Sequence, residues 1–280
     1  MGKGGSVADL IEGIEIMSTS ALSGKTALVT GGATLFGKAV VKELAAAGAN
    51  VAVMDIDEVG GAAAVSPLGA KGRFFKGDVT VDSDLSSTIS AVVSNFGGLD
   101  VLVNLAASYN DAGAASTREQ WLSTLNINLV SAAIAGELAR PHLKKSGKGV
   151  IINLSSISSK VAQTGRWVYP VSKAGMVQLT RNQAMDYAAD GIRVNSVSPG
   201  WTWSAIMEML SKDDRKKTDR VAAPFHLTQR VGDPEEIGKV IAFLASDAAS
   251  VVTGADWAAD GGYSAMGPEQ AVPAIPLLEG

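Results

Sequence analysis

Short, continuous apolar runs alternate along the chain with longer segments in which apolar residues recur at helical spacing. Such runs are typical of strands buried on both faces of a parallel sheet. They lie at Thr26–Thr30, Asn50–Met54, Arg73–Lys76, Leu99–Val103, Val150–Leu154, Ile192–Val197 and Ala255–Ala259. The helical pattern covers residues 36–47, 82–96, 117–145, 166–189 and 234–246. Because right-handed crossovers between parallel strands place helices on both faces, this order predicts an α/β fold with a Rossmann-like, doubly wound parallel sheet of about seven strands.

The strand and helix pattern spans residues 24–264, which predicts one domain with a segment at either end. Residues 1–23 form a short N-terminal arm in this interpretation. Residues 265–280 are rich in proline and small apolar residues, so they cannot form a regular helix. Because an apolar tail would be poorly solvated if it were free, we expect it to pack on a neighbouring subunit.

The composition excludes several classes of function. The chain of 280 residues contains no cysteine, which rules out disulfides, thiolate catalysis and cysteine-bound metals. Its two histidines, His142 and His226, lack the spacing of metal ligands, so we expect no metal site. The net charge of −4 without a basic cluster argues against nucleic acid or an anionic membrane as a partner. No uninterrupted apolar run is long enough to cross a bilayer and no signal peptide is recognisable, so we expect a soluble, cytoplasmic protein.

The first apolar run leads directly into a glycine turn and then a helix. Gly31 and Gly32 follow the strand, and the helical pattern begins at Phe36. Such a turn aims backbone N–H groups and the positive end of the helix at a phosphate. Asp55 ends the next strand, where a carboxylate can accept hydrogen bonds from an adenosine ribose. A lone glycine turn is also common in ordinary surface loops, so this interpretation needs support from other motifs.

Tyr169 and Lys173 lie four residues apart in a segment with helical pattern. That spacing places both side chains on one helix face, with an ammonium beside a phenol. A neighbouring cation favours the phenolate, so we expect Lys173 to lower the pKa of Tyr169 and to make its phenol a proton carrier near neutral pH. Ser156 lies upstream, just after the run Val150–Leu154, at a strand end where α/β proteins place their chemistry.

Several motifs occur together in the order typical of one enzyme family. The turn Thr30–Gly37 resembles the pattern T-G-x-x-x-G-x-G, Gly77-Asp78-Val79 resembles an acidic contact near adenine, and Asn104–Ala107 resembles N-N-A-G. Further matches are Asn128, Ser156, Tyr169, Lys173 and the turn Pro199-Gly200. On these motifs the chain resembles the short-chain dehydrogenase/reductase family over nearly its whole length.

The resemblance implies roles for individual residues. Reversible hydride transfer between a nicotinamide cofactor and an alcohol or ketone would take place beside Tyr169, which exchanges a proton with the substrate oxygen, and Ser156, which orients that oxygen. Lys173 would also hold the nicotinamide ribose, and Asn128 would support a water that leads protons to it. The implied cofactor contacts are Gly31, Thr34, Leu35, Phe36, Gly37, Asp55, Ile56, Asp78, Val79, Asn104, Ala106, Tyr169, Lys173, Pro199, Gly200 and Thr202.

Two motifs depart from the family pattern. Leu35 replaces the second glycine of the turn, and Leu105 and Ala107 alter N-N-A-G. Glycine permits a close approach of pyrophosphate, so Leu35 either weakens cofactor binding or is accommodated by a small shift, and we expect accommodation. Asp55 would repel the 2′-phosphate of NADP and suits the free ribose of NAD, so we predict NAD as the cofactor.

Residues 201–225 follow the Pro199-Gly200 turn and are expected to form a lid over the substrate. The predicted substrate contacts are Ser156, Gln163, Trp167, Tyr169, Trp201, Trp203 and Met207. Their size favours a hydrophobic or aromatic secondary alcohol or ketone, although the tryptophans would equally suit packing of the lid against its own domain or a partner subunit.

Other functions remain open at this point. The same fold and cofactor could dehydrogenate a cyclic diol or carry out an epimerisation, and the altered glycine turn allows a nucleotide-binding regulatory protein with little cofactor affinity. The helical segments 117–145 and 166–189 resemble the pair that forms the subunit interface of the family, so we expect a homotetramer or a homodimer.

Overall fold

The computed structural model describes residues 21–268, 270 and 276 of the chain. Within that part, seven strands form one sheet in which every neighbouring pair is parallel. The strands are β1 Thr26–Thr30, β2 Asn50–Asp55, β3 Gly72–Lys76, β4 Val101–Asn104, β5 Val150–Leu154, β6 Arg193–Pro199 and β7 Asp256–Ala259. They lie in the order β3-β2-β1-β4-β5-β6-β7, so the direction of winding reverses between β1 and β4. Doubly wound sheets bind ligands at the carboxyl ends of the strands beside such a reversal.

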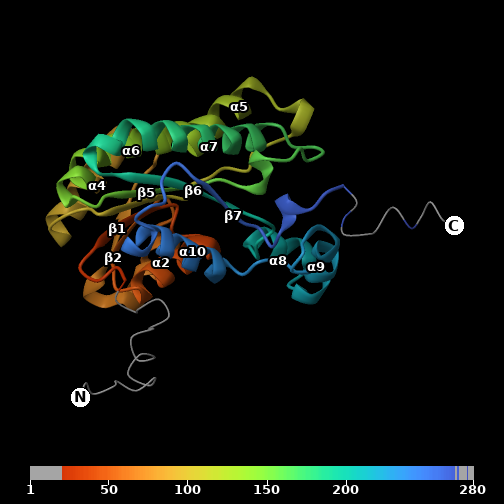
Figure 1. The fold of residues 1–280 in the computed structure, drawn as a ribbon, viewed down its shortest axis with the longest axis horizontal. Helices are drawn as coiled ribbons and strands as arrows, with labels where there is room; N and C mark the ends of the chain where they lie inside the picture. The colour runs from red at the N-terminus through yellow and green to blue at the C-terminus, as the bar shows by residue number, and fades with distance from the viewer. Residues whose placement is uncertain (1–20, 269, 271–275, 277–280) are drawn as a thin grey trace, which may run out of the picture.

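Helices cover both faces of the sheet (Figure 1), which confirms the predicted fold class. One face carries α2 Leu35–Ala46, α3 Glu58–Val65 and α10 Pro234–Ala245. The other carries α4 Asp82–Phe96, α6 Ser131–Ser146 and α7 Val168–Tyr187. The helix α5 Arg118–Leu125 continues through a π-helical turn, Asn126–Val130, into α6. Two short helices, α8 Ala205–Ser211 and α9 Arg215–Ala222, stand together at one end of the sheet (Figure 1).

Side chains along each central strand alternate between two apolar cores. In β1, Ala27 and Val29 join the core beneath α2 and α10, whereas Leu28 joins the core beneath α4, α6 and α7. All three are fully buried, and burying a large apolar side chain contributes about 1.5–3 kcal/mol. Burial on both faces explains why these strands are continuous apolar runs in the sequence.

Two helical details differ from the expectation. The segment 117–145 is one continuous helical stretch, but its hydrogen-bonding pattern changes at the π turn Asn126–Val130.

The helix α3 was not predicted, because its sequence Glu58–Val65 contains two adjacent glycines, which disfavour helix. The Asp57 side chain compensates by accepting a hydrogen bond from the Gly60 N–H at 3.0 Å, which caps the helix.

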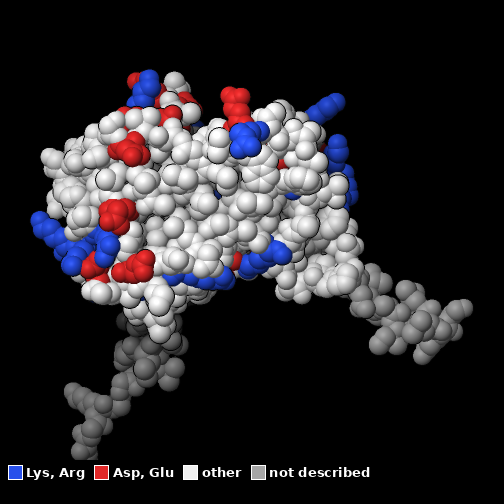
Figure 2. All heavy atoms as spheres, turned by 90° about the horizontal axis from the view of Figure 1, so that it is seen from above, with Lys and Arg blue, Asp and Glu red and all other residues white. Residues whose placement is uncertain are grey.

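Among the described residues, the helical stretch Arg118–Ser146 is long and apolar enough to cross a membrane, although polar residues interrupt it. Of its most apolar window, 39% is buried against the rest of the protein. Seen from above, the face over these helices carries few charged side chains across its middle (Figure 2).

The arm predicted over residues 1–23 and the tail predicted over residues 265–280 lie largely outside the described residues.

Candidate active site

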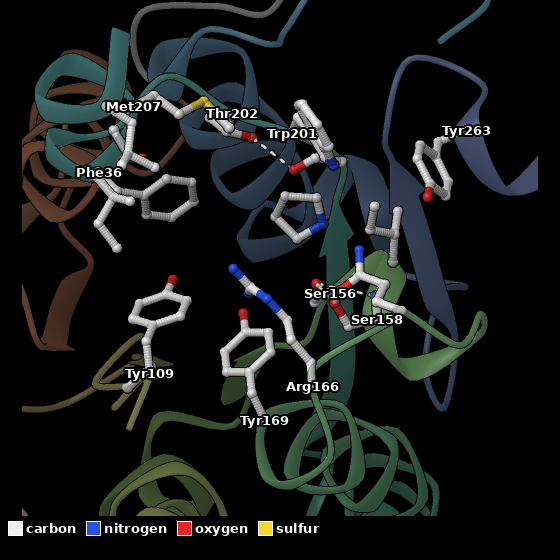
Figure 3. A pocket seen from close by; sticks show the side chains of 18 of the residues that line it. Phe36, Tyr109, Ser156, Ser158, Arg166, Tyr169, Trp201, Thr202, Met207 and Tyr263 are labelled. Carbon is white, nitrogen blue, oxygen red and sulfur yellow. Dashed lines mark hydrogen bonds between the residues drawn. The ribbon is translucent and has the colours of Figure 1, made fainter. Parts of the chain in front are cut away.

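A cavity of about 970 Å³ opens at the carboxyl ends of the strands (Figure 3). Its walls come from parts of the chain that are distant in sequence. They are the glycine turn after β1, the loop after β4, the loop between β5 and α7 with the start of α7, the segment after β6 that includes α8 and α9, and Tyr263 after β7. A space of this size suits a cofactor and a small substrate together.

The glycine turn packs backbone against backbone with the end of β4. Gly31 has φ of +75°, and a Cβ at this position would lie 2.6 Å from the Ala106 nitrogen. A Cβ on Gly37 would meet the Gly31 oxygen at 2.6 Å, so the turn admits a side chain at neither position. The Thr34 hydroxyl accepts a hydrogen bond from the Gly37 N–H at 2.9 Å and caps α2. The start of α2 therefore faces the cavity in the geometry that binds phosphate.

Leu35 occupies the first position of α2 rather than the interior of the turn. Its side chain is 39% exposed and lines the cavity together with Thr34 and Phe36. The close contacts of the turn are made by Gly31 and Gly37, which the chain retains. The leucine thus leaves the backbone of the turn intact and adds an apolar surface at the cavity wall.

Asp55 is held at the tip of this turn. Its Oδ2 accepts a hydrogen bond from the Ala33 N–H at 2.9 Å, and its Oδ1 accepts one from the Asp57 N–H at 3.0 Å. The carboxylate is therefore fixed beside the glycine turn, where the ribose of a dinucleotide would lie. Further along the same edge, Asp78 accepts hydrogen bonds from the backbone and hydroxyl of Thr80 at 2.8 and 2.7 Å. This donor and acceptor set fits the adenosine half of a nicotinamide cofactor.

Ser156, Tyr169 and Lys173 come together where β5 ends and α7 begins. Tyr169 lies in the first turn of α7 and is 7% exposed, with its hydroxyl directed into the cavity (Figure 3). The Lys173 Nζ lies 5.6 Å from the centre of the Tyr169 ring and donates a hydrogen bond to the Leu154 carbonyl at 2.7 Å. The predicted helix spacing thus places both side chains on one face beside Ser156.

The pKa of Tyr169 is shifted upward, which the sequence did not predict. Burial raises it well above its ordinary value, and the phenol of Tyr109 raises it further, whereas Ser156 and the charge of Arg166 lower it. Burial also lowers the pKa of Lys173 itself, to about 8. The phenol pKa is therefore raised overall rather than lowered as the sequence led us to expect, and Arg166 is a nearby cation that works to lower it. The effect of Lys173 on the phenol stays a prediction.

Tyr109 is a site residue that sequence reasoning missed. Its ring stacks on the Tyr169 ring, with centroids 4.8 Å apart and planes at 22°, and it lines the cavity (Figure 3). Tyr109 lies in the loop after β4, and its only sequence signal is an aromatic residue shortly after a strand end. The stacking covers one face of the Tyr169 ring.

Asn128 and Asn104 have structural contacts rather than places on the cavity wall. The buried Asn128 accepts a hydrogen bond from the Ser108 N–H at 2.6 Å and donates to the Ser108 oxygen and the Ser172 hydroxyl, both at 3.0 Å. It thereby joins the loop after β4 to α7. The Asn104 amide donates to Asn153 at 2.9 Å inside the sheet. The Asn104 side chain is thus engaged across the strands, and its predicted contact with the cofactor stays a prediction.

Asp111, which the sequence did not suggest, sets where α7 begins. Its Oδ2 accepts a hydrogen bond from the Tyr169 N–H at 2.9 Å, and its Oδ1 accepts bonds from the N–H groups of Trp167 and Gly113 at 3.1 and 2.9 Å. Burial works to raise the pKa of Asp111, but these donors outweigh it and hold the pKa below its usual value. A carboxylate on one loop thus positions the backbone of Tyr169.

We expect Asp111→Ala to lower kcat about 10-fold or more, because the start of α7 would lose its cap and Tyr169 its fixed position. The free energy of unfolding should fall by about 1–2 kcal/mol. Steady-state kinetics and denaturant titration measure both, with Asp186→Ala, an exposed site near the other end of α7, as the control. An unchanged kcat in Asp111→Ala would show that the helix start does not depend on this cap.

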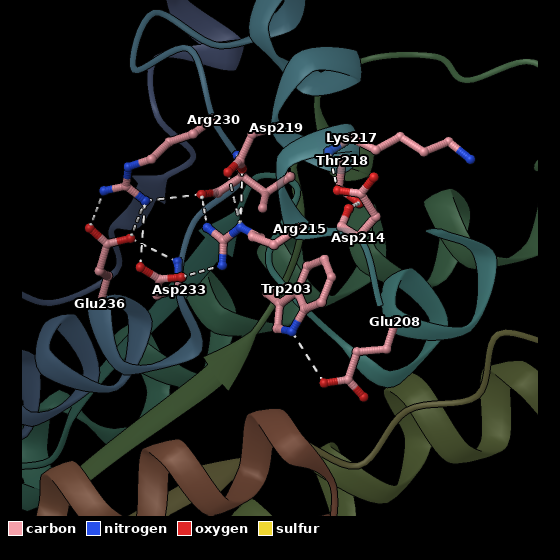
Figure 4. Close-up of polar contacts among 11 residues, drawn as sticks. Trp203, Glu208, Asp214, Arg215, Lys217, Thr218, Asp219, Arg230, Asp233 and Glu236 are labelled. Atoms are coloured by element: carbon pink, nitrogen blue, oxygen red, sulfur yellow. Dashed lines mark hydrogen bonds and ion pairs between the residues drawn. The ribbon is translucent and has the colours of Figure 1, made fainter. Parts of the chain in front are cut away.

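The residues after β6 divide between the cavity and the lid interior. Trp201, Thr202 and Met207 line the cavity, as does Gln163 from the loop after β5. Trp203 instead donates from its indole Nε1 to Glu208 at 3.2 Å, and the Arg215 guanidinium lies 5.3 Å from its ring centre (Figure 4). Trp167 is 52% exposed and also lies off the cavity wall. The structure therefore places neither Trp203 nor Trp167 on the cavity wall, and their predicted contact with substrate stays a prediction.

An ion-pair network holds the lid to α10 (Figure 4). Arg215 reaches Asp219 within α9 at 3.1 Å and Asp233, the cap of α10, at 2.6 Å. Arg230 pairs with Glu236 at 2.6 Å. Trp203 packs at the edge of this network, which explains why its indole is directed away from the cavity.

Comparison with known proteins agrees with this geometry. A family model described as enoyl-(acyl carrier protein) reductase matches residues 31–264. The chain is 37% identical to cis-4-hydroxycyclohexanecarboxylate dehydrogenase of Sinomonas cyclohexanicum, over 88% of this chain and 99% of that protein. It is 35% identical to 2,5-dichloro-2,5-cyclohexadiene-1,4-diol dehydrogenase of Sphingobium indicum, over 88% of this chain and 100% of that protein. The crystal structure of gox2181 superposes with a TM-score of 0.81 at 30% identity, covering 90% of this chain and 100% of the other.

The chain belongs to the short-chain dehydrogenase/reductase family. It is an oxidoreductase of that family, and its Ser156, Tyr169 and Lys173 stand at the positions that carry the family resemblance. Ser156 and Tyr169 line one cavity with Thr34, Leu35 and Phe36 beside the glycine turn, although the turn and the serine are far apart in the sequence. Lys173 is buried behind Tyr169, with its Nζ 5.6 Å from the ring centre.

Proposed function

We propose that the protein is an NAD-dependent dehydrogenase that oxidises a secondary alcohol on a hydrophobic ring to the ketone, and reduces the ketone in reverse. The observation that carries the proposal is the meeting of Ser156 and Tyr169 with the glycine turn around one cavity, with Lys173 buried behind the tyrosine. A pure nucleotide-binding module has no need of a phenol, a hydroxyl and a buried amine arranged beside its ligand.

The residues of the chain have separate tasks in this reaction. When bound, the nicotinamide ring supplies a carbon that accepts or gives the hydride. Ser156 orients the substrate oxygen, and Tyr169 exchanges the proton with it. Lys173, 5.6 Å from the tyrosine ring centre, holds positive charge behind the phenol and would bind the nicotinamide ribose. Thr34, Gly37 and the start of α2 would bind the pyrophosphate.

NAD is proposed over NADP because Asp55 is fixed by two backbone N–H groups beside the turn. We expect NADH to bind more tightly than NADPH, since the carboxylate would repel a 2′-phosphate. Asp55→Asn keeps an oxygen that can accept from the Ala33 N–H but removes the charge, so NADPH affinity should rise about 10-fold. Titration by nicotinamide fluorescence measures both. Equal NADPH affinity in wild type and Asp55→Asn would show that Asp55 does not select NAD over NADP.

A ring-bearing substrate is supported by two observations. The cavity wall carries Phe36, Trp201, Met207 and Leu210, which suit an apolar ring. Two similar proteins are named as dehydrogenases of a hydroxycyclohexanecarboxylate and of a cyclohexadienediol. A turnover screen of cyclohexanols, cyclic diols and aromatic alcohols tests the substrate. Net formation of NADH separates a dehydrogenase from an epimerase, which returns the cofactor unchanged.

We further propose a homotetramer or homodimer assembled through α5, α6 and α7. Leu122 of α5, Val130 of the π turn and Val171 of α7 are exposed. Seen from above, the face over these helices carries few charged side chains across its middle (Figure 2). Such an apolar face is typical of a surface that another subunit covers. Light scattering of the purified protein gives the assembly, and a monomer at micromolar concentration would contradict it.

A further inference from the structure

Arg166 introduces a positive charge into a cavity wall that is otherwise mainly apolar. It lies in the loop between β5 and α7, three residues before Tyr169. In Figure 3 its guanidinium extends across the cavity above Tyr169, between Tyr109 and Ser156. The charge is close enough to the reacting group to act on it, because Arg166 is one of the two residues that lower the pKa of the Tyr169 phenol.

This charge is not balanced by the protein. Of the described residues that line the cavity, none is an aspartate or a glutamate, and the other cation among them is Lys217 of α9. Within residues 21–268, no ion pair or side-chain hydrogen bond to the Arg166 guanidinium is found. By contrast, Arg215 pairs with Asp233, and Arg230 pairs with Glu236. Arg166 therefore offers its donors to a ligand.

A guanidinium presents parallel N–H donors that match the two oxygens of a carboxylate. Its place decides which part of a substrate it would hold. Ser156 and Tyr169 take the oxygen that is oxidised, so an anion on Arg166 belongs to the far side of the same molecule. Phe36, Met207 and Leu210 line the same cavity and supply apolar walls for the ring of the substrate.

We propose that Arg166 binds the carboxylate of the substrate, so that the enzyme acts on cyclic hydroxy acids and the matching keto acids in preference to neutral alcohols. The inference rests on the proposed dehydrogenase function and specifies its substrate class. During oxidation the carbinol carbon would give a hydride to the nicotinamide, its hydroxyl would give its proton to the phenolate form of Tyr169, and the C–O bond would become C=O. The carboxylate is unchanged by the reaction and serves only for recognition.

The test compares an acid with its neutral counterpart in wild type and variants. The substrates are 4-hydroxycyclohexanecarboxylate and its methyl ester. We expect Arg166→Met to lower kcat/KM for the acid about 10- to 100-fold, mainly through KM, and to change the ester less than about 3-fold. Arg166→Lys should recover part of the loss. Lys216→Met is the control for a general loss of positive charge, because Lys216 lies on α9 but outside the cavity wall. This variant should leave kcat/KM unchanged for both substrates.

A binding measurement separates recognition from an effect on the phenol. Cyclohexanecarboxylate has no carbinol to oxidise, and calorimetry in the presence of NADH should show its affinity reduced about 10- to 100-fold in Arg166→Met. If Arg166 acted only through Tyr169, Arg166→Met would lower kcat equally for the acid and the ester, and the pH profile of kcat would move to higher pH for both. The affinity for cyclohexanecarboxylate would then be the same in Arg166→Met and wild type. That result would overturn the proposal.

The wild-type enzyme also distinguishes this inference from the function on which it rests. Turnover of neutral cyclohexanols without preference for the acid would refute the carboxylate site and leave the dehydrogenase intact. Failure to oxidise acids, esters, cyclic diols and alcohols with either NAD or NADP would refute the dehydrogenase itself. A preference for the acid that disappears in Arg166→Met supports both.

Discussion

Replacing Tyr169 by phenylalanine should lower kcat about 1,000-fold or more, because the enzyme would lose the group that exchanges a proton with the substrate oxygen. The phenyl ring would keep its stacking on Tyr109 and its position over the Lys173 ammonium. The free energy of unfolding should therefore change by less than about 1 kcal/mol. Steady-state kinetics with the best alcohol found in the screen, together with NADH titration, gives the result.

The matched control is Tyr187→Phe, the same change near the other end of α7. The Tyr187 hydroxyl donates to Glu137 at 3.0 Å and lies off the cavity wall, so kcat should stay within about 2-fold of wild type. NADH should bind Tyr169→Phe with wild-type affinity. Near-normal turnover by Tyr169→Phe would mean that another group moves the proton, and Tyr109 would be the first candidate because it stacks on the same ring.

Lys173→Met should inactivate the enzyme and at the same time stabilise the fold. Turnover should fall about 100-fold or more, because the phenol would lose the charge behind it and the cofactor ribose a donor. Burial lowers the pKa of Lys173 to about 8, so keeping its ammonium at pH 7 costs about 3 kcal/mol. Losing the hydrogen bond to the Leu154 carbonyl costs about 1 kcal/mol, which leaves a net gain of about 2 kcal/mol.

The pH dependence of this gain has a definite sign. Between about pH 8 and pH 10.4 the unfolded chain keeps a lysine proton that the folded protein has released, so wild-type stability from this group rises with pH. The difference in unfolding free energy between Lys173→Met and wild type should therefore be largest near pH 7 and shrink towards pH 10. Denaturant titrations across this range measure it, with exposed Lys145→Met as the control. A Lys173→Met protein that is less stable than wild type at pH 7 would contradict the account.

The sequence was sufficient for features that depend on local periodicity and on strand polarity. All seven strands were predicted. The strands β1, β2, β4 and β5 were the plainest, because strands buried on both faces have no polar side to show. The four-residue spacing of Tyr169 and Lys173 predicted a shared helix face, since helix geometry alone decides it. Parallel strands all end at one edge, so Ser156 and the glycine turn could be placed near each other before any contact was known.

Only the tertiary structure decided how side chains from different loops meet. Asp111 caps the helix of Tyr169 across 58 residues of sequence, and Tyr109 stacks on the same tyrosine from that loop. Trp203 is directed into the lid by Glu208 and Arg215, although Trp201 two positions earlier lines the cavity. Loop backbones have no repeating geometry, so the direction of such side chains follows from burial and from available hydrogen-bond partners. For the same reason, sequence spacing did not reveal that the charge of Arg166 also acts on the Tyr169 phenol.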